Sequence, residues 1–423
     1  MLLRFGVSNY LSIKDRQELS LVASSLKDDE SGLITPPATV KARLLPAAVI
    51  YGANASGKSN VVKALSFMRS FALSSHSKGE PGKSIGVTRF ALDPDCTGQC
   101  SAFDLDFIAG GKRFAYSFSV TREAVESEEL VAYPHSRPQL WFMRKGQEFS
   151  FGKSFTGRNR VIADLVRPNS LFLSAAAQND HEMLKVVMGF FVDLPMPLNC
   201  DDGIFSGLVS KWHREIDDRA IKFLGEIGSG VVGQDIKRPT LEESQRLVAE
   251  RMRLIPGNSE ARRARYEKIY ERPTIQFAHE GKGGIQYFFD FHQESTGTQR
   301  LLILLEQIFK SLDAGSPLII DEIEVGLHSK ASEALVALFI SPKTNPRGAQ
   351  LIVTTHDTNL MRSPLLRRDQ IWIMEKNREG ASELSSLSDF RTRSTDDFEK
   401  AYLQGRFGGT PYVGLARDLV ELM

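Results

Sequence analysis

The sequence predicts an α/β protein in which an antiparallel β region and a parallel sheet are separated by an inserted helical segment. Residues 86–122 alternate apolar and polar side chains around Gly110-Gly111, which indicates an antiparallel hairpin. Residues 298–355 alternate between helical and strand patterns, as is typical of a parallel sheet. Residues 181–272 are rich in charge and helical in pattern, so we expect them to form an insertion.

Composition sets broad limits on what the chain can be. Its 423 residues are 42% hydrophobic and 25% charged, which is typical of one large globular domain or two modest ones. A net charge of +1 excludes a global field that would attract the whole molecule to nucleic acid or a membrane. Three cysteines cannot form a disulfide framework, and the N-terminus lacks the pattern of a signal peptide. We therefore expect a cytoplasmic protein without a membrane span.

The N-terminal part is expected to begin with β-structure. Residues 1–25 alternate as two short strands joined by a turn near Asn9. Residues 44–51 form an apolar run that predicts a buried strand, and residues 58–74 place apolar side chains at helical spacing. Residues 170–178 (SLFLSAAAQ) are interpreted as a buried strand that runs into a loop.

Strand and helix patterns alternate again after the insertion. The expected elements are strands within 274–291, a helix at 298–312, a strand at 317–320, a helix at 329–340 and a strand at 349–355. The chain then divides into an N-terminal part (1–180), an inserted helical lobe (181–272) and a C-terminal part (273–423).

A phosphate-binding motif follows the strand at 44–51. Gly52-Ala53-Asn54-Ala55-Ser56-Gly57-Lys58-Ser59 matches G-x-x-x-x-G-K-[ST], and a helix begins at Lys58. The glycines allow successive backbone N–H groups to point at phosphates, and the helix N-terminus adds partial positive charge. Lys58 would reach the β- and γ-phosphates, and the Ser59 hydroxyl would ligate Mg²⁺. The alternative is a glycine-rich turn with an exposed lysine, but the strand and helix around the motif favour a nucleotide site.

Acidic, serine and histidine residues lie at further strand and helix ends. The strand at 317–320 ends in Asp321, a candidate for the Mg²⁺ shell, and Glu322, a candidate general base. Either carboxylate could instead be a solvated cap. Ser295-Thr296-Gly297 precedes a helix, where it could bind an anion or serve only as an N-cap. His356 follows another strand and could be structural or could contact the γ-phosphate.

The order of these motifs resembles the ABC-type ATPase heads, in particular the SMC and RecF-like branch. More closely, the chain is similar to the stand-alone ATPases of prokaryotic restriction and phage-defence operons. The matching segments span nearly the whole chain and are FGVSNYLSIKD, YGANASGKSN, LFLSAAAQND, ESTGTQR, LIIDEIEVGLHSKA, IVTTHDTNLM, RRDQIWIMEK and YLQGRFGGTP. The resemblance implies a head in which a mixed antiparallel β subdomain adjoins a parallel sheet, with ATP and Mg²⁺ as ligands.

The resemblance also implies roles for single residues. The loop and the following Asn60 would bind ATP, Asn9 would lie near the adenine, and Gln178 would link Mg²⁺ to the inserted lobe. Ser295 and Gly297 would contact the γ-phosphate held by a second protomer, and residues 324–328 would cross the dimer interface. Thr296 and Thr298 stand where many such proteins carry Gly and Gln or Glu, and 181–272 replaces the very long coiled coil of SMC proteins.

Several functions fit these features. The first is an ATP-driven switch, a homodimer of heads or a higher oligomer. The resemblance implies that its partner would be an effector, often a nuclease from the same operon, and that its trigger would be phage infection. The second is a DNA-binding repair or restriction ATPase, with candidate contacts at Arg262, Arg263, Arg265, Arg367 and Arg368.

A nuclease and a membrane-transporter subunit are weaker alternatives. The acidic residues that suggest a nuclease are Asp104, Asp106, Asp396, Asp397 and Glu399, and they follow no nuclease-like arrangement. The shape of the insertion and the lack of a membrane region argue against the transporter subunit.

Overall fold

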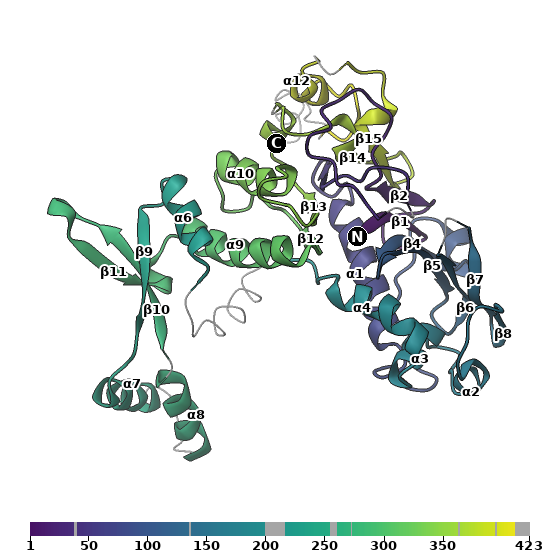
Figure 1. Cartoon of the computed structure of the whole chain (residues 1–423), viewed down its shortest axis with the longest axis horizontal. Coiled ribbons are helices and arrows are strands. Elements are labelled where there is room, and N and C mark those ends of the chain that lie inside the picture. The colour runs from purple at the N-terminus through teal and green to yellow at the C-terminus, as the bar shows by residue number, and fades with distance from the viewer. Residues whose placement is uncertain are drawn as a thin grey trace, which may run out of the picture. The chain divides into compact units, whose positions relative to one another are not determined.

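The protein is described here by a computed structural model, which covers residues 1–37, 40–134, 137–198, 216–253, 260–271, 273–362, 364–393 and 396–410 (Figure 1). Its described residues form two compact units. The first unit comprises Met1–Asn199, Ser311–Glu324 and Ser332–Met423, and the second comprises Cys200–Lys310 and Val325–Ala331. No helix in the described ranges is both long enough and apolar enough to cross a membrane.

The first unit contains an antiparallel sheet that runs through the N-terminal third of the chain. Its strand order is β2-β1-β4-β5-β6-β7-β8. The strands are β1 (Leu2–Ser8), β2 (Gln17–Ser20), β4 (Ser101–Ala109), β5 (Lys112–Val120), β6 (Val125–Tyr133), β7 (Gln139–Lys145) and β8 (Glu148–Phe151). The expected hairpin is confirmed as β4–β5, where Ala109 pairs with Lys112 across the two glycines.

A second sheet in the same unit has the order β12-β13-β3-β14-β15. The first four strands are parallel, and β15 pairs antiparallel with β14. Its strands are β3 (Ala47–Tyr51), β12 (Pro317–Ile320), β13 (Gln350–Thr354), β14 (Ile371–Lys376) and β15 (Ser382–Ser386). The predicted fold class, α/β with an antiparallel β subdomain beside a parallel sheet, is therefore confirmed.

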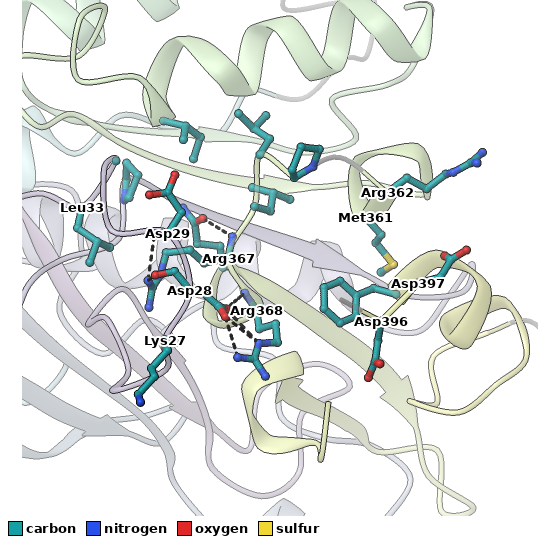
Figure 2. Close-up of a pocket in the computed structure, with 18 residues that line it drawn as sticks. Lys27, Asp28, Asp29, Leu33, Met361, Arg362, Arg367, Arg368, Asp396 and Asp397 are labelled. Atoms are coloured by element: carbon teal, nitrogen blue, oxygen red, sulfur yellow. Dashed lines mark hydrogen bonds and ion pairs between the residues drawn. The ribbon is translucent and has the colours of Figure 1, made fainter. Parts of the chain in front are cut away.

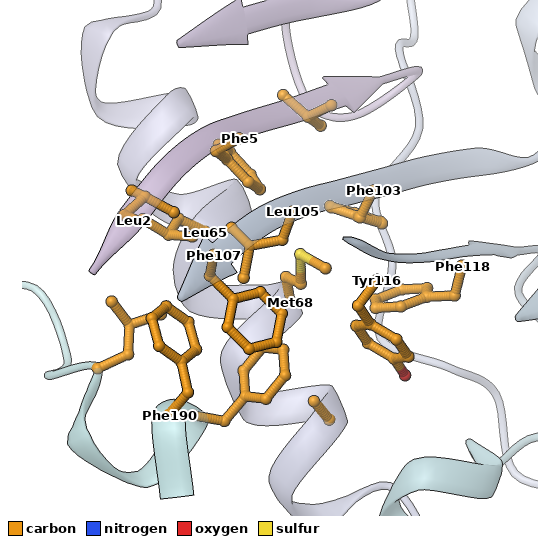
Figure 3. Close-up of a cluster of buried hydrophobic side chains, with 14 of the residues drawn as sticks. Leu2, Phe5, Leu65, Met68, Phe103, Leu105, Phe107, Tyr116, Phe118 and Phe190 are labelled. Carbon is orange, nitrogen blue, oxygen red and sulfur yellow. The ribbon is translucent and has the colours of Figure 1, made fainter. Parts of the chain in front are cut away.

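Helix α1 (Lys58–Ser74) contributes to a core shared by both sheets of this unit. Its residues Leu65 and Met68 belong to one buried cluster with Phe103 from β4 and Ile50 from β3. Figure 3 shows the part of this cluster in which Phe5, Phe103, Leu105 and Phe107 surround the side of α1. Each buried apolar side chain contributes about 1.5–3 kcal/mol. This packing holds the start of α1 at the end of β3.

The remaining helices of the first unit are shorter than α1. They are α2 (Asn159–Ala163), α3 (Phe172–Gln178), α4 (Lys185–Asp193), α10 (Ser329–Ile340), α11 (Asn359–Arg362) and α12 (Phe398–Leu403). The predicted strand over 170–178 is wrong, because this segment forms helix α3. The buried carboxylate of Glu128 accepts the backbone N–H groups of Phe172 and Leu173 and thereby caps that helix.

The second unit carries its own three-stranded antiparallel sheet, β11-β10-β9. Its elements are α6 (Asp218–Glu226), β9 (Val231–Lys237), α7 (Leu241–Arg253), α8 (Glu260–Tyr270), β10 (Thr274–Glu280), β11 (Gln286–Asp290) and most of α9 (Thr296–Ala314). Strand β9 corrects the expectation that 181–272 is purely helical. Strands β10 and β11, which we expected in the C-terminal part of the head, belong to this sheet instead, where β10 pairs with both β9 and β11.

Candidate functional site

Neighbouring parallel strands bring three distant chain segments to one edge of the sheet. In the register of this sheet, Ile320 of β12 pairs with Val353 of β13, and Thr354 pairs with Ile50 of β3. The segments that begin at Gly52, Asp321 and Thr355 therefore leave the sheet side by side. The carboxyl edge of a parallel sheet is where ligands bind in open α/β folds.

The loop that follows β3 leaves the start of α1 open. Gly57 has φ 109°, and no side chain within the described ranges caps the first backbone N–H groups of α1. A Cβ at this position would overlap the hydroxyl of Ser382 and lie 2.7 Å from that of Ser12, so only glycine fits. The buried Ser56 hydroxyl also has no hydrogen-bond partner within the described part of the chain. Uncapped N–H groups at a helix start fit a phosphate group.

The side chain of Lys58 is buried and folded back over this loop. Its Nζ lies 2.8 Å from the Gly52 carbonyl oxygen, 3.2 Å from that of Ala53 and 3.0 Å from His356 Nε2. Burial lowers the pKa of Lys58, and the carboxylates of Glu324 and Glu322 oppose that shift. The ammonium group therefore sits where it could exchange loop carbonyls for phosphate oxygens.

Ser59, Asp321 and Thr354 form a cluster of oxygen atoms beside the lysine. Ser59 donates a hydrogen bond to Asp321 Oδ1 at 3.1 Å, and Thr354 donates to the same oxygen at 2.5 Å. A serine hydroxyl and a carboxylate are ligands that Mg²⁺ prefers. The residues present therefore fit a magnesium ion. Thr354 was missed in the sequence, where it reads as an ordinary strand residue.

The backbone at Glu322 is held in the left-handed region, with φ 55°. Its N–H donates to Thr354 Oγ1 at 2.8 Å, which supports this conformation, and its side chain is exposed. A non-glycine residue in this region costs about 1–2 kcal/mol. Strained backbone of this kind is common at functional sites. Here, the left-handed conformation of Glu322 turns the chain directly after Asp321.

His356 is held beside Lys58 through its own backbone. Its N–H donates to Glu324 Oε1 at 2.7 Å. Burial and the positive charge of Lys58 lower the pKa of the imidazole, so it is neutral at neutral pH and can accept a hydrogen bond from the lysine. The second carboxylate oxygen of Glu324 is buried without a hydrogen-bond partner in the part of the chain that the structure describes.

Asn9, expected near an adenine, has its side chain committed elsewhere. It is 4% exposed, its Nδ2 donates to the Cys96 carbonyl at 2.9 Å and its Oδ1 accepts the Phe90 N–H at 3.0 Å. The Asn9 side chain thus anchors the segment around residues 90–100 through hydrogen bonds. A nucleotide contact from its side chain would require these hydrogen bonds to break.

Two serines that the sequence did not single out support the phosphate loop instead. Ser382 donates to the Ser56 carbonyl at 2.6 Å and lies 2.6 Å from the Ser12 hydroxyl. Asn60, expected to bind the nucleotide, donates its amide to Ser12 at 2.6 Å. The loop is therefore braced by the turn after β1 and by the start of β15, which no local pattern could reveal.

Gln178 is not brought to the loop. It is exposed at the end of α3, whose Ser174 accepts the His76 N–H just beyond the far end of α1. Since a helix rises 1.5 Å per residue, His76 lies about 25 Å from Lys58. One further turn of α3 cannot cover that distance. The segment that does reach the acidic edge ends at Leu198, whose carbonyl accepts the Asp321 N–H at 3.1 Å.

The serine–glycine segment lies in the second unit. The Ser295 hydroxyl accepts the Thr298 N–H at 3.1 Å, so it caps α9. A Cβ at Gly297 would lie 2.9 Å from the Gly326 carbonyl, so the glycine allows the helix start and the 325–328 segment to approach closely. The proximity of Ser295 and Gly297 to a phosphate group stays a prediction.

Arg367 and Arg368, expected as DNA contacts, are buried beside a cavity of about 510 Å³ (Figure 2). Arg367 pairs with Asp369 at 2.9 Å and Arg368 with Asp28 at 2.7 Å. Since they precede β14, they lie at the amino edge of the sheet, away from the loop. These two arginines are therefore structural, and their expected role in DNA contact is corrected.

The acidic residues that suggested a nuclease also have structural partners. Asp104 pairs with Arg16 at 2.7 Å, and Asp106 pairs with Arg113. Asp397 caps α12, and Glu399 accepts the Thr358 hydroxyl at 2.7 Å. These contacts account for the acidic pairs without any nuclease chemistry.

Comparison with known proteins places this chain in a family. Residues 47–180 and 205–362, well over half of the chain, match the family model described as "AAA domain, putative AbiEii toxin, Type IV TA system". No match is found among curated proteins. Among solved structures, the chain is similar to one titled "Crystal structure of the SmcHead bound to the C-winged helix domain of ScpA". That match has 14% identity and a TM-score of 0.41, and it covers 92% of this chain and 99% of the other.

Proposed function

We propose that this chain, which belongs to the AAA-domain family whose model it matches, is an ATP-hydrolysing switch. The observation that carries the proposal is the arrangement at the carboxyl edge of the parallel sheet. There, Lys58, the uncapped start of α1 and the Ser59–Asp321 oxygen pair lie together. This combination fits a nucleoside triphosphate with its metal ion.

Each residue has a distinct task in the proposed reaction. The α1 N–H groups and Lys58 bind and orient the phosphates, and Ser59 and Asp321 hold the Mg²⁺ ion. When bound, Mg²⁺ supplies positive charge that offsets the charge developing on the transferred phosphoryl group. Glu322 accepts the proton of the attacking water, and neutral His356 keeps the Lys58 ammonium in place through a hydrogen bond.

The switch is completed by a second copy of the chain. We infer from the resemblance described above that Ser295 and Gly297 of one head contact ATP held by another, so that hydrolysis separates the heads. A switch of this kind works only if ATP binds the joined state more tightly than the separated one. The family description names a putative toxin of a toxin–antitoxin system. From the resemblance described above, we propose that the switch serves a cytoplasmic defence system and acts on an effector nuclease.

A DNA-binding restriction or repair ATPase is the second candidate. The observation that favours it is the exposure of Arg263 and Arg265 on α8. DNA binding that weakens steeply with salt, and that is lost when both arginines are replaced by glutamine, would support this candidate. Lack of DNA binding at low salt would eliminate it.

The Glu322→Gln variant tests the proposed switch. It should bind ATP as well as the parent chain while phosphate release falls about 10²- to 10⁴-fold, because the general base is lost. Glu148→Gln, an exposed change on β8, serves as the control and should keep full activity. Unchanged phosphate release in Glu322→Gln would eliminate Glu322 as the base.

Co-expression of the Glu322→Gln chain with the parent chain tests the composite site. If two heads share each ATP, mixed pairs should stall, and phosphate release should fall below the share contributed by the parent chains. Phosphate release that simply follows the share of parent chains would mean that each head works alone.

A further inference from the structure

The sheet of the second unit ends in an edge strand whose aromatic side chains are exposed. On β11, Tyr287 is 50% exposed, Phe288 43% and Phe289 39%. Among the described residues, this strand pairs only with β10. Edge strands of stable proteins are usually protected by lysine, proline or a bulge, and β11 (QYFFD) contains none of these. Such an edge is suited to pairing with another strand.

The backbone groups on the outer side of β11 follow from its pairing with β10. Gly281 donates its N–H to the Ile285 carbonyl at 2.8 Å, so this opposed pair is hydrogen-bonded. Hydrogen-bonded pairs alternate along an antiparallel ladder, so Tyr287 and Phe289 also bond to β10. The N–H and C=O groups of Gln286 and Phe288, and the C=O of Asp290, therefore point outward. The Asp290 N–H also lies on that side, where it donates to Gln293 Oε1 at 2.7 Å.

We propose that two copies of this chain associate by antiparallel pairing of their β11 strands about a two-fold axis at Phe288. In this register, Phe288 exchanges both backbone hydrogen bonds with Phe288 of the second copy. The Gln286 N–H of each copy donates to the Asp290 carbonyl of the other copy. These are the outward-pointing groups. A register shifted by one residue would instead centre on Phe289, whose backbone groups already bond to β10.

The side chains of β11 are self-complementary in this register. Gln286 faces Asp290 of the second copy as an amide–carboxylate pair, and the chain already uses such a pair where Gln276 Nε2 donates to Asp290 Oδ1 at 2.9 Å. Tyr287 faces Phe289 of the second copy, and cross-strand aromatic pairs stabilise sheets. No like charges meet across the axis. This self-complementarity favours a second copy of the chain over an unrelated strand.

Pairing through β11 would make a dimer that needs no nucleotide. It would keep two heads at a high effective concentration, so that their engagement around ATP becomes an intramolecular step. The proposal depends on contacts within the second unit and is independent of the ATPase function proposed above.

The mass of the nucleotide-free full chain in solution tests the proposal. Light scattering after gel filtration at micromolar concentration should give twice the 47.1 kDa of one chain. Phe288→Lys should halve that mass, because two ammonium groups would face each other on the axis. Val232→Lys is the matched control, since this valine is 49% exposed on β9 at the opposite edge of the same sheet. It should remain a dimer.

A charge-swap experiment tests the register and guards against misfolding of one variant. Phe288→Lys and Phe288→Glu should each be monomeric, and an equimolar mixture should regain the dimer mass. A monomeric parent chain, a dimeric Phe288→Lys chain or a mixture that stays monomeric would overturn the proposal. Lys58→Ala should remain a nucleotide-free dimer, so loss of ATP binding and loss of β11 pairing are separate outcomes.

Discussion

Helices α1 and α9 both begin directly after one small residue, Gly57 and Ser295 respectively, but their first turns are satisfied differently. At α1, Gly57 precedes the helix in a left-handed conformation, and no side chain among the residues that the structure describes caps the N–H groups. At α9, the hydroxyl of Ser295 accepts the Thr298 N–H at 3.1 Å. The start of α1 is braced from outside by Ser382 and Ser12, whereas α9 is capped by its own residue.

This difference separates a preformed anion site from a conditional one. The N–H groups of α1 are left without a side-chain acceptor at a cost that a phosphate can offset. At α9, the Ser295 hydroxyl already accepts the Thr298 N–H. This hydroxyl can therefore contact an anion only if that hydrogen bond breaks. The following predictions test this contrast, from the largest expected effect to the smallest.

Lys58→Ala should cause the largest change. It removes a lysine that folds over the open helix start, and a charge-assisted bond to phosphate contributes about 1.5–3 kcal/mol. ATP affinity should therefore fall about 10- to 100-fold, measured by titration with a fluorescent ATP analogue. The control is Lys63→Ala, an exposed change on the same helix. Equal affinity in both variants would refute the assignment of the phosphate loop.

Gly57→Ala should unfold or distort the loop. The added methyl group meets the hydroxyls of Ser382 and Ser12 and forces alanine into a left-handed conformation. Strain and overpacking together should destabilise the fold by about 2–4 kcal/mol in urea unfolding, and ATP binding should be lost. Gly189→Ala on α4, where a methyl group meets nothing within 4 Å, should be neutral or stabilising by up to about 1 kcal/mol. Similar stability of the two variants would contradict this account of the loop.

Replacing Ser295 should separate its cap from its proposed phosphate contact. Ser295→Ala should cost about 1 kcal/mol of stability because the cap is lost, and Ser295→Asp should restore it. If Ser295 also contacts ATP across the head interface, both variants should reduce phosphate release, since aspartate repels phosphate. Recovery of turnover in Ser295→Asp would show that the residue acts as a cap alone.

The smallest effect concerns the pH dependence of stability. Since burial and Lys58 lower the pKa of His356, the unfolded chain binds more protons than the folded chain just below pH 6.5. The contribution of His356 to stability is therefore present above that pH and is lost as the pH falls. Urea midpoints at pH 7.5 and 5.5 should differ more in the parent chain than in His356→Gln. An equal difference in the two proteins would remove His356 from this account.

Sequence patterns predicted much of the site because each of its main segments directly follows an apolar strand. The loop at 52–59, Asp321 and His356 each follow an apolar run, and a parallel sheet brings such ends to one edge. The patterns failed where a distant partner decides the outcome. Residues 170–178 are apolar enough for a strand, but Glu128 caps them as a helix. The side chain of Asn9, which the resemblance places near an adenine, is bonded to Phe90 and Cys96, and the proximity of its turn to a nucleotide stays a prediction.

The sequence by itself determined the α/β class, the phosphate loop and the acidic strand end, because hydrophobic periodicity and glycine spacing act over a few residues. Only the tertiary structure decided which residues brace that site. Thr354 orients Asp321, and Ser12 and Ser382 hold the loop, each from a segment far away in the chain. Strand order and register bring these atoms within hydrogen-bond distance, and neither can be read from the pattern of a single segment.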